Sequence, residues 1–178
     1  MDKFSLKAGA IPTVTWLDGT SDGEQAEEKL LDVAARSGSA ALNVVPDRNY
    51  TAGKTDQKLK NLYDVVELAE KRHLPLVVGT EMNSPGQKFV DDFDSAELAP
   101  LLPTFLKGAY IIYAHSVLQR QCGLGYTSEW AEKNFPSTKE KNEFFEKLGD
   151  SLETDREQEL AVFNDIAKPK DILEKANA

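Results

Sequence analysis

The stretch PLVVGTEMN, from Pro75 to Asn83, joins a short apolar run to an abrupt polar ending. A proline opens it, and Gly79, Thr80 and Glu81 follow its last valine. Apolar runs of this length, rich in β-branched residues and bounded by turn-forming residues, are typical of buried strands. The stretch therefore predicts a strand over 75–83 whose carboxyl end carries a carboxylate.

Further apolar runs, separated by amphipathic segments, lie on both sides of this stretch. Three of them, IPTVTWLDG, SAALNVVPD and AYIIYAHS, predict strands at residues 11–19, 39–47 and 109–116. Ser21 and Gly38 bound the first predicted helix, and Thr55 caps the second. Strands that alternate with helices indicate an α/β fold with a parallel sheet of βαβ units. Because every strand is apolar through its middle, we expect helices on both faces of a sheet or around a barrel.

The alternation ends after the fourth predicted strand. A third helix is expected from about Ser95 to Gly108, with a kink at Pro100. Short helices are predicted to begin at Thr127 or Ser128 and at Ser137. From residue 150 the chain is polar, so we predict an α/β domain over 1–149 and a peripheral helical tail over 150–178.

Composition narrows the classes of function. The chain has 178 residues and a net charge of −9, which argues against a nucleic-acid or anionic membrane surface. No apolar run approaches the length of a membrane span, and the first residues lack a signal-peptide pattern, so a cytoplasmic location is expected. The single cysteine, Cys122, excludes an internal disulfide and has no nearby histidine to activate it.

Polar side chains follow all four predicted strands. Right-handed crossovers make the strands parallel and bring their carboxyl ends to one rim, where α/β sites form. The opposite rim, at the helix-to-strand turns, carries no comparable set. The candidate site residues on the rim are Asp18, Asn43, Asp47, Arg48, Asn49, Glu81, Asn83 and His115.

Each candidate also has a purely structural interpretation. Asp47 and Asn49 suit a turn after Pro46, and Arg48 can pair with Asp47. His115 can be a neutral, hydrogen-bonded residue at a strand end. Glu81 is different, because burial raises the pKa of a carboxyl group unless a cation or hydrogen-bond donors compensate.

The succession LNVVPDRN, then VVGTEMN with GQKFVDDFD, then GAYIIYAHSVL, resembles the carboxyl-terminal part of a (βα)8 metal-dependent hydrolase-type barrel of the amidohydrolase or PHP kind. The resemblance implies a half TIM-type barrel that acts on a phosphate ester or an amide-like bond. It also implies a divalent metal ion held by Glu81 and His115. Asp47 and Arg48 would then be catalytic, with four substrate-binding residues at Asp18, Asn43, Asn49 and Asn83.

Two departures from that family keep other functions open. The chain has no HxH pair, and it supplies about four βα units where a barrel needs eight. Four parallel strands leave two unpaired edges, so we expect a homodimer or a complex with a complementary chain. A non-catalytic subunit, or a protein that binds a small polar ligand, is the alternative. A barrel isomerase or aldolase is disfavoured, because no predicted strand ends in a lysine.

Overall fold

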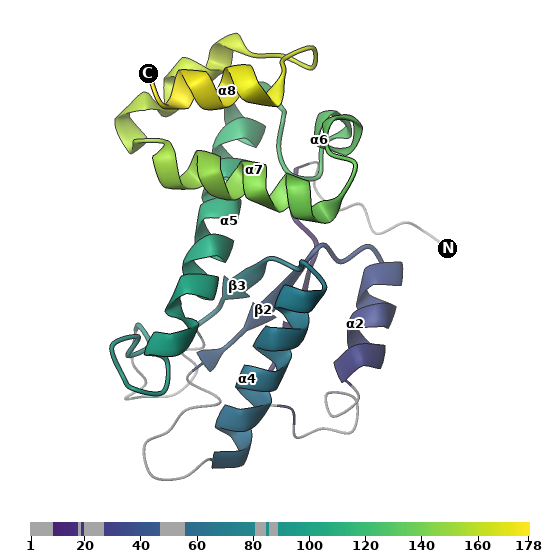
Figure 1. Cartoon of the computed structure of the whole chain (residues 1–178), viewed down its shortest axis with the longest axis vertical. Helices are drawn as coiled ribbons and strands as arrows, with labels where there is room; N and C mark the ends of the chain where they lie inside the picture. The colour runs from purple at the N-terminus through teal and green to yellow at the C-terminus, as the bar shows by residue number, and fades with distance from the viewer. Residues whose placement is uncertain (1–8, 18, 20–26, 47–55, 81–84, 86–88) are drawn as a thin grey trace. The chain divides into compact units, whose positions relative to one another are not determined.

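A computed structural model of the chain describes residues 9–17, 19, 27–46, 56–80, 85 and 89–178 (Figure 1). The chain divides into two compact units. The sheet unit comprises Thr13–Lys107, and the helical unit comprises Met1–Pro12 together with Gly108–Ala178.

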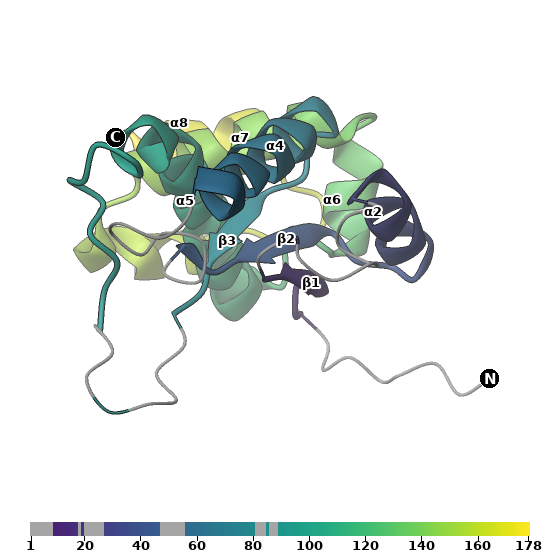
Figure 2. The ribbon, with the colours of Figure 1, turned by 90° about the horizontal axis from the view of Figure 1, so that it is seen from below.

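Within its described residues, the sheet unit contains three strands, each followed by a helical segment. Its three strands are β1 (Thr13–Trp16), β2 (Ala41–Val44) and β3 (Leu76–Val78). They are parallel and neighbour one another in chain order, β1-β2-β3 (Figure 2). The connections between them contain the helices α2 (Glu27–Arg36) and α4 (Asp56–Lys71). The predicted α/β class, the parallel sheet and the first three strands are confirmed.

Local sequence signals account for the two connecting helices. Gly38, with a φ of 93°, lies just beyond the end of α2, as predicted. In α4 apolar residues recur at helical spacing and lie on the buried side, with Leu62 and Ala69 both 0% exposed. The predicted caps Ser21 and Thr55 lie outside the described residues.

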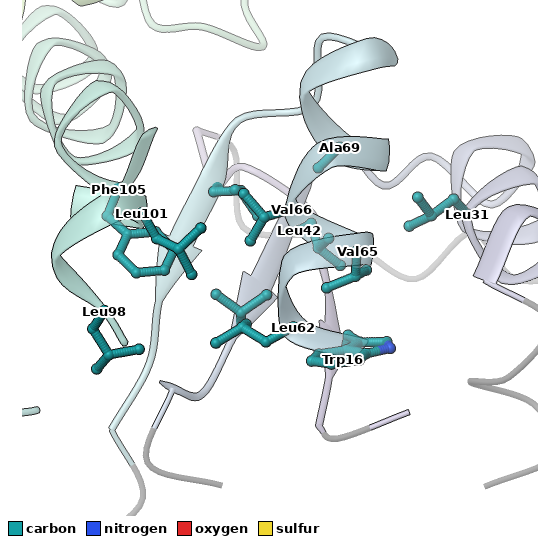
Figure 3. Packing of buried hydrophobic residues seen from close by; sticks show 12 residues of the cluster. Trp16, Leu31, Leu42, Leu62, Val65, Val66, Ala69, Leu98, Leu101 and Phe105 are labelled. Atoms are coloured by element: carbon teal, nitrogen blue, oxygen red, sulfur yellow. The ribbon is translucent and has the colours of Figure 1, made fainter. Parts of the chain in front are cut away.

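The core of the sheet unit lies on one face of the sheet. Alternate strand residues pack there against helices, including Trp16, Leu42 and Leu76. Figure 3 shows that Leu31 of α2, residues of α4, and the segment that follows β3 all converge on this layer. The helical partners in this cluster are Leu31, Leu62, Val65, Val66, Ala69, Leu98, Leu101 and Phe105.

The other face of the sheet is not the apolar surface that we predicted. Thr13 and Thr15 are exposed there, and Asn43 and Val77 are half-buried, although Ala41 on the same face is buried. The three helical segments of this unit contribute to the core on the opposite side. Of the two expected arrangements, helices on both faces of the sheet are not found among the described residues of this unit, and helices around a barrel stay a prediction.

The predicted fourth strand at residues 109–116 is also wrong. This segment lies inside α5 (Leu102–Cys122), which follows the short 3-10 helix η1 (Ala99–Leu101). Pro100 occupies the start of this helical stretch, and Gly108 does not end it. Buried residues recur at helical spacing, at Ile111, Ala114, His115 and Leu118. A short apolar run does not by itself distinguish a strand from a buried helix, and here the helix forms.

The helical unit continues with four elements after α5. They are α6 (Glu129–Asn134), α7 (Thr138–Ser151), η2 (Thr154–Val162) and α8 (Pro169–Ala176). The predicted caps are confirmed, since the hydroxyl groups of Ser128 and Ser137 accept hydrogen bonds from the N–H groups of Ala131 and Glu140. Trp130 and Phe144 anchor an aromatic core, with ring centroids 5.7 Å apart.

Residues 150–178 pack more tightly than the predicted peripheral tail. Leu160 and Ile172 are both 0% exposed. The indole N–H of Trp130 donates to the carbonyl oxygen of Ala167 at 2.8 Å. The boundary predicted after residue 149 stays a prediction, and α7 runs across that position.

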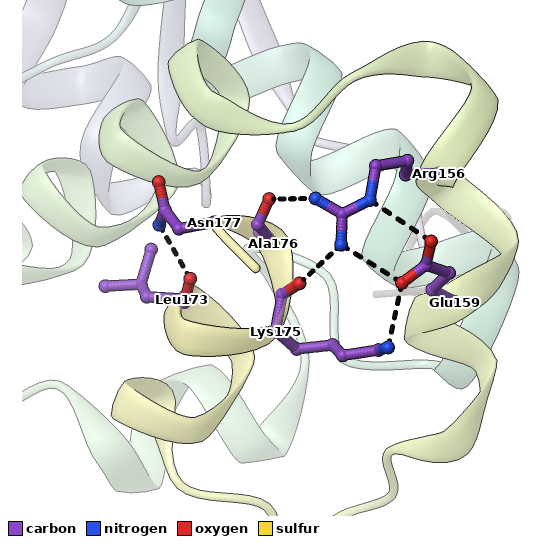
Figure 4. A network of polar contacts seen from close by, with 6 residues as sticks. All are labelled: Arg156, Glu159, Leu173, Lys175, Ala176 and Asn177. Carbon is purple, nitrogen blue, oxygen red and sulfur yellow. Dashed lines mark hydrogen bonds and ion pairs between the residues drawn. The ribbon is translucent and has the colours of Figure 1, made fainter.

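Arg156 holds the end of α8 in place (Figure 4). Its guanidinium group donates to the carbonyl oxygens of Lys175 and Ala176, each at 3.0 Å, and to both carboxylate oxygens of Glu159. Lys175 also pairs with Glu159 at 2.8 Å. Carbonyl groups at the end of a helix have no partner within the helix, so this guanidinium supplies one for two of them.

Candidate functional site

The carboxyl ends of the three strands meet at one edge of the sheet. Trp16 pairs in register with Val44, and Val44 pairs with Val78, so β1, β2 and β3 end level with one another. Chain segments that follow level strand ends leave the sheet at the same edge. We call this edge the rim. Six predicted site residues follow these strands in sequence but lie outside the described residues, namely Asp18, Asp47, Arg48, Asn49, Glu81 and Asn83.

Asn43 is the predicted rim residue that the structure describes in the sheet itself. It lies in β2, one residue before the strand ends, between Thr15 of β1 and Val77 of β3. Its side-chain amide donates to the hydroxyl oxygen of Thr15 at 3.3 Å. A Cβ at Gly79 would lie 2.8 Å from Oδ1 of Asn43, so the missing side chain at residue 79 leaves room for this amide.

Trp16 places a buried indole at the end of β1, on the helix-covered face. The residue is 0% exposed. Its Nε1 has no hydrogen-bond partner within the part of the chain that the structure describes. Nearby, a Cβ at Gly19 would lie 3.0 Å from the indole ring and 2.8 Å from the amide of Asn61. Buried donors are nearly always satisfied, so this N–H marks an unusual position at the rim.

His115 is not at a strand end, so its predicted place on the rim is wrong. It lies within α5, in the helical unit, and is 6% exposed. Its Nδ1 accepts a hydrogen bond from the backbone N–H of Tyr126 at 2.9 Å. Burial lowers the pKa of His115, and a hydrogen bond to the backbone of Gly9 opposes this effect.

This environment gives His115 a structural role. A metal ion bound at Nδ1 would need the lone pair that already accepts from Tyr126. The structure therefore gives no support to a metal site shared by Glu81 and His115. The predicted metal itself stays a prediction, because Glu81 lies outside the described residues. Within the described ranges, no group of three or more His, Cys, Asp or Glu side chains is arranged to hold a metal ion.

Cys122 is a partly buried, free thiol at the end of α5. Its Sγ donates to the carbonyl oxygen of Leu118 at 3.3 Å. Burial raises the pKa of this thiol, which disfavours the thiolate form needed for nucleophilic attack.

Four residues in notable positions, Thr15, Trp16, Gly79 and Asp91, were not among the candidates predicted from the sequence. Thr15 and Trp16 looked like ordinary strand residues, and Gly79 looked only like a strand terminator. Asp91 is a buried carboxylic acid residue, 9% exposed, in the segment between β3 and η1. The strict alternation of TVTW could have identified Thr15 and Trp16 as residues on opposite faces of β1, because alternate strand residues point to opposite faces of a sheet.

Comparison with protein-family models, curated proteins and solved structures finds no match to this chain. The resemblance to the amidohydrolase and PHP barrels therefore stays a prediction. One helical stretch among the described residues, Ala99–Cys122, is long and apolar enough to cross a membrane. The core helix of a soluble protein passes the same test, and 44% of the apolar window is buried inside the protein.

Proposed function

We propose that this chain is a barrel-type α/β segment that binds a small polar molecule at the rim of its sheet. In this proposal, strands from a second copy or from a complementary chain complete the sheet. The observation that carries it is the winding of the sheet unit. Three parallel strands follow one another in chain order, and the helical segments after all three pack on one face.

This winding distinguishes two kinds of α/β protein. In doubly wound folds the strand order reverses, so that helices cover both faces of the sheet. In a (βα)8 barrel every crossover runs in the same direction, and the helices lie outside while the other face lines the interior. One half of a doubly wound fold also has its strands in chain order with the crossover helices on one face. The barrel-type arrangement is favoured because the helical segment after β3 contributes to that same layer, through Leu98, Leu101 and Phe105.

Partner strands would pair with the backbone N–H and C=O groups at the two edges of such a sheet. A barrel is closed by eight strands, and a three-stranded parallel sheet offers an edge on each side. Val77, half-buried on the face opposite the helices, would become part of the barrel interior. The rim would then collect residues from more strands than this chain supplies, which is how barrel sites are normally built.

The test compares two variants, each with one new lysine, on opposite sides of the sheet unit. Val77→Lys puts an ammonium group on the face that the proposal buries. Val33→Lys makes the same change on α2, where the valine is already 60% exposed. Light scattering across a micromolar concentration series measures the mass of each protein. We expect wild type and Val33→Lys to assemble, and Val77→Lys to remain a monomer that keeps its circular dichroism spectrum.

A wild-type protein that stays monomeric throughout this series contradicts self-assembly. Addition of a candidate complementary chain then tests the remaining form of the proposal. If Val77→Lys assembles as well as wild type, the sheet face is not the interface.

A metal-dependent hydrolase is a second candidate, favoured by the sequence positions of acidic residues. Asp18, Asp47 and Glu81 follow β1, β2 and β3 by two or three residues each. Carboxylates at strand ends are suitable ligands for a divalent ion, which would polarise a phosphate ester or an amide-like bond. The described residues form no such ligand group, so no catalytic step is assigned here. Metal analysis of a Glu81 variant tests this candidate.

A further inference from the structure

We infer that Asn43 and Thr15 form a binding site for a neutral, hydroxyl-bearing molecule, such as a polyol or a sugar. This inference rests on the proposed function and assigns a ligand class to the sheet face near the rim. The first observation is the position of Asn43 inside a strand. Asparagine is depleted in strands, and β2 places one in the central strand of a parallel sheet, between Thr15 and Val77.

The amide of Asn43 is held in place from two sides. On the β1 side it donates to Thr15 at 3.3 Å. On the β3 side it occupies the space that a Cβ at Gly79 would need, at 2.8 Å from its oxygen and 3.0 Å from its nitrogen. The N–H of Gly79 donates to the carbonyl oxygen of Val44 at 2.8 Å, which fixes this glycine against β2. A side chain fixed in this way is preorganised for binding.

Hydrogen-bonding capacity remains after these contacts. A side-chain amide has two N–H donors and an oxygen with two lone pairs. Asn43 uses one donor on Thr15, and its oxygen accepts no hydrogen bond from any described residue. Thr15 accepts from Asn43 and still has its own hydroxyl hydrogen to donate. Both side chains lie on the face away from the helices, where Thr15 is exposed and Asn43 is half-buried.

The side chains of the surrounding strands indicate whether the ligand group is charged or neutral. The three strands, TVTW, ALNV and LVV, contain no charged side chain. A phosphate or carboxylate bound in this row would find no cation in the strands to compensate its charge. An adjacent donor and acceptor pair instead matches a hydroxyl group, which both donates and accepts a hydrogen bond.

The experiment measures binding of myo-inositol and of glucose by saturation-transfer NMR, with inorganic phosphate as a competitor. Asn43→Leu removes the hydrogen-bonding group but keeps a similar side-chain volume. Gly79→Ala keeps Asn43 but places a Cβ where its amide lies. Thr13→Val is the matched control, because Thr13 is an exposed threonine on the same face, one row further from the rim.

We expect wild type and Thr13→Val to bind at least one of the two polyols equally well. Asn43→Leu and Gly79→Ala should each weaken binding about tenfold or more, because each leaves polar ligand groups unpaired. Gly79→Ala is the safeguard against misfolding, because its Cβ meets the movable end of a side chain and not the backbone.

Three results would overturn the inference. They are the absence of polyol binding to wild type, unchanged binding by both variants, and displacement of the polyol by phosphate. Polyol binding by a monomeric protein would leave this inference standing while contradicting completion of the sheet by a second copy of the chain. Assembly of the chain without polyol binding would contradict this inference and leave the proposed assembly standing.

Discussion

Substitution of Gly149 by alanine should destabilise the helical unit, although alanine is the better helix former. Gly149 lies in α7 and faces the backbone of Tyr110 in α5. A Cβ there would lie 2.1 Å from the carbonyl oxygen of Tyr110 and 2.6 Å from its carbonyl carbon. Such contacts are not found below 3.0 Å, so the two backbones must separate by about 0.9 Å, the difference between 3.0 and 2.1 Å.

Two effects of opposite sign decide the size of the change. Replacing glycine by alanine inside a helix stabilises by roughly 0.5 to 1 kcal/mol. Overpacking a well-packed interface costs about 1 to 3 kcal/mol, and the upper end applies because the obstacle is backbone and cannot rotate away. Phe145 and Leu148, both 0% exposed, would move with α7. The net loss is therefore roughly 2 kcal/mol.

Thermal unfolding followed by circular dichroism measures this effect. For a chain of this size, a loss of roughly 2 kcal/mol lowers Tm by about 4 to 8 °C. Lys147→Ala, at an exposed position of the same helix, is the control and should leave Tm nearly unchanged. If Gly149→Ala raises Tm, helix propensity outweighs the contact and the packing of α5 against α7 described here is refuted.

Three further predictions concern the site candidates and the Arg156 network. His115→Ala should lower the free energy of unfolding by about 1 to 3 kcal/mol in a urea titration, because the buried N–H of Tyr126 loses its acceptor; a fully stable variant would contradict the structural role. Glu81→Gln should lower the content of bound divalent metal in elemental analysis, whereas Glu67→Gln, exposed on α4, should not; equal metal content in both disproves the metal site. Hydrogen bonds from Arg156 and Lys175 lower the pKa of Glu159 from 4.5 to about 2, so its stabilising effect is complete above pH 4.5 and is lost as the pH falls towards 2. Acid titration of Glu159→Gln should lack this contribution, and an identical acid transition in both proteins would exclude it.

The sheet unit could be predicted because its local signals agree with its tertiary packing. The first three strands are short apolar runs, each followed by a helix with a clear buried side, and Gly38 marks the end of α2. The caps at Ser128 and Ser137 were predictable for the same reason, since a serine hydroxyl satisfies a helix N–H without help from distant residues.

The error at residues 109–116 came from a segment that carries two compatible signals. AYIIYAHS is apolar enough for a buried strand, and its flanking residues also extend a helix through Gly108. Tertiary packing decides between them, and no local signal reports it. His115 was consequently assigned to the rim, although its partners are backbone groups of the helical unit. Asn43 was predicted as a binding residue. Its contacts with Thr15 and Gly79 could not be predicted, because they follow from the register in which the three strands pair.

The chain contains two tryptophans, and one of them lies in the core of each unit. Trp16 belongs to the sheet unit and Trp130 to the helical unit, where its indole N–H is hydrogen-bonded to Ala167. Trp16→Phe and Trp130→Phe would therefore leave proteins whose fluorescence reports on one unit at a time. With these two intrinsic probes, a denaturant titration can tell whether the units unfold together or in sequence, without any attached label.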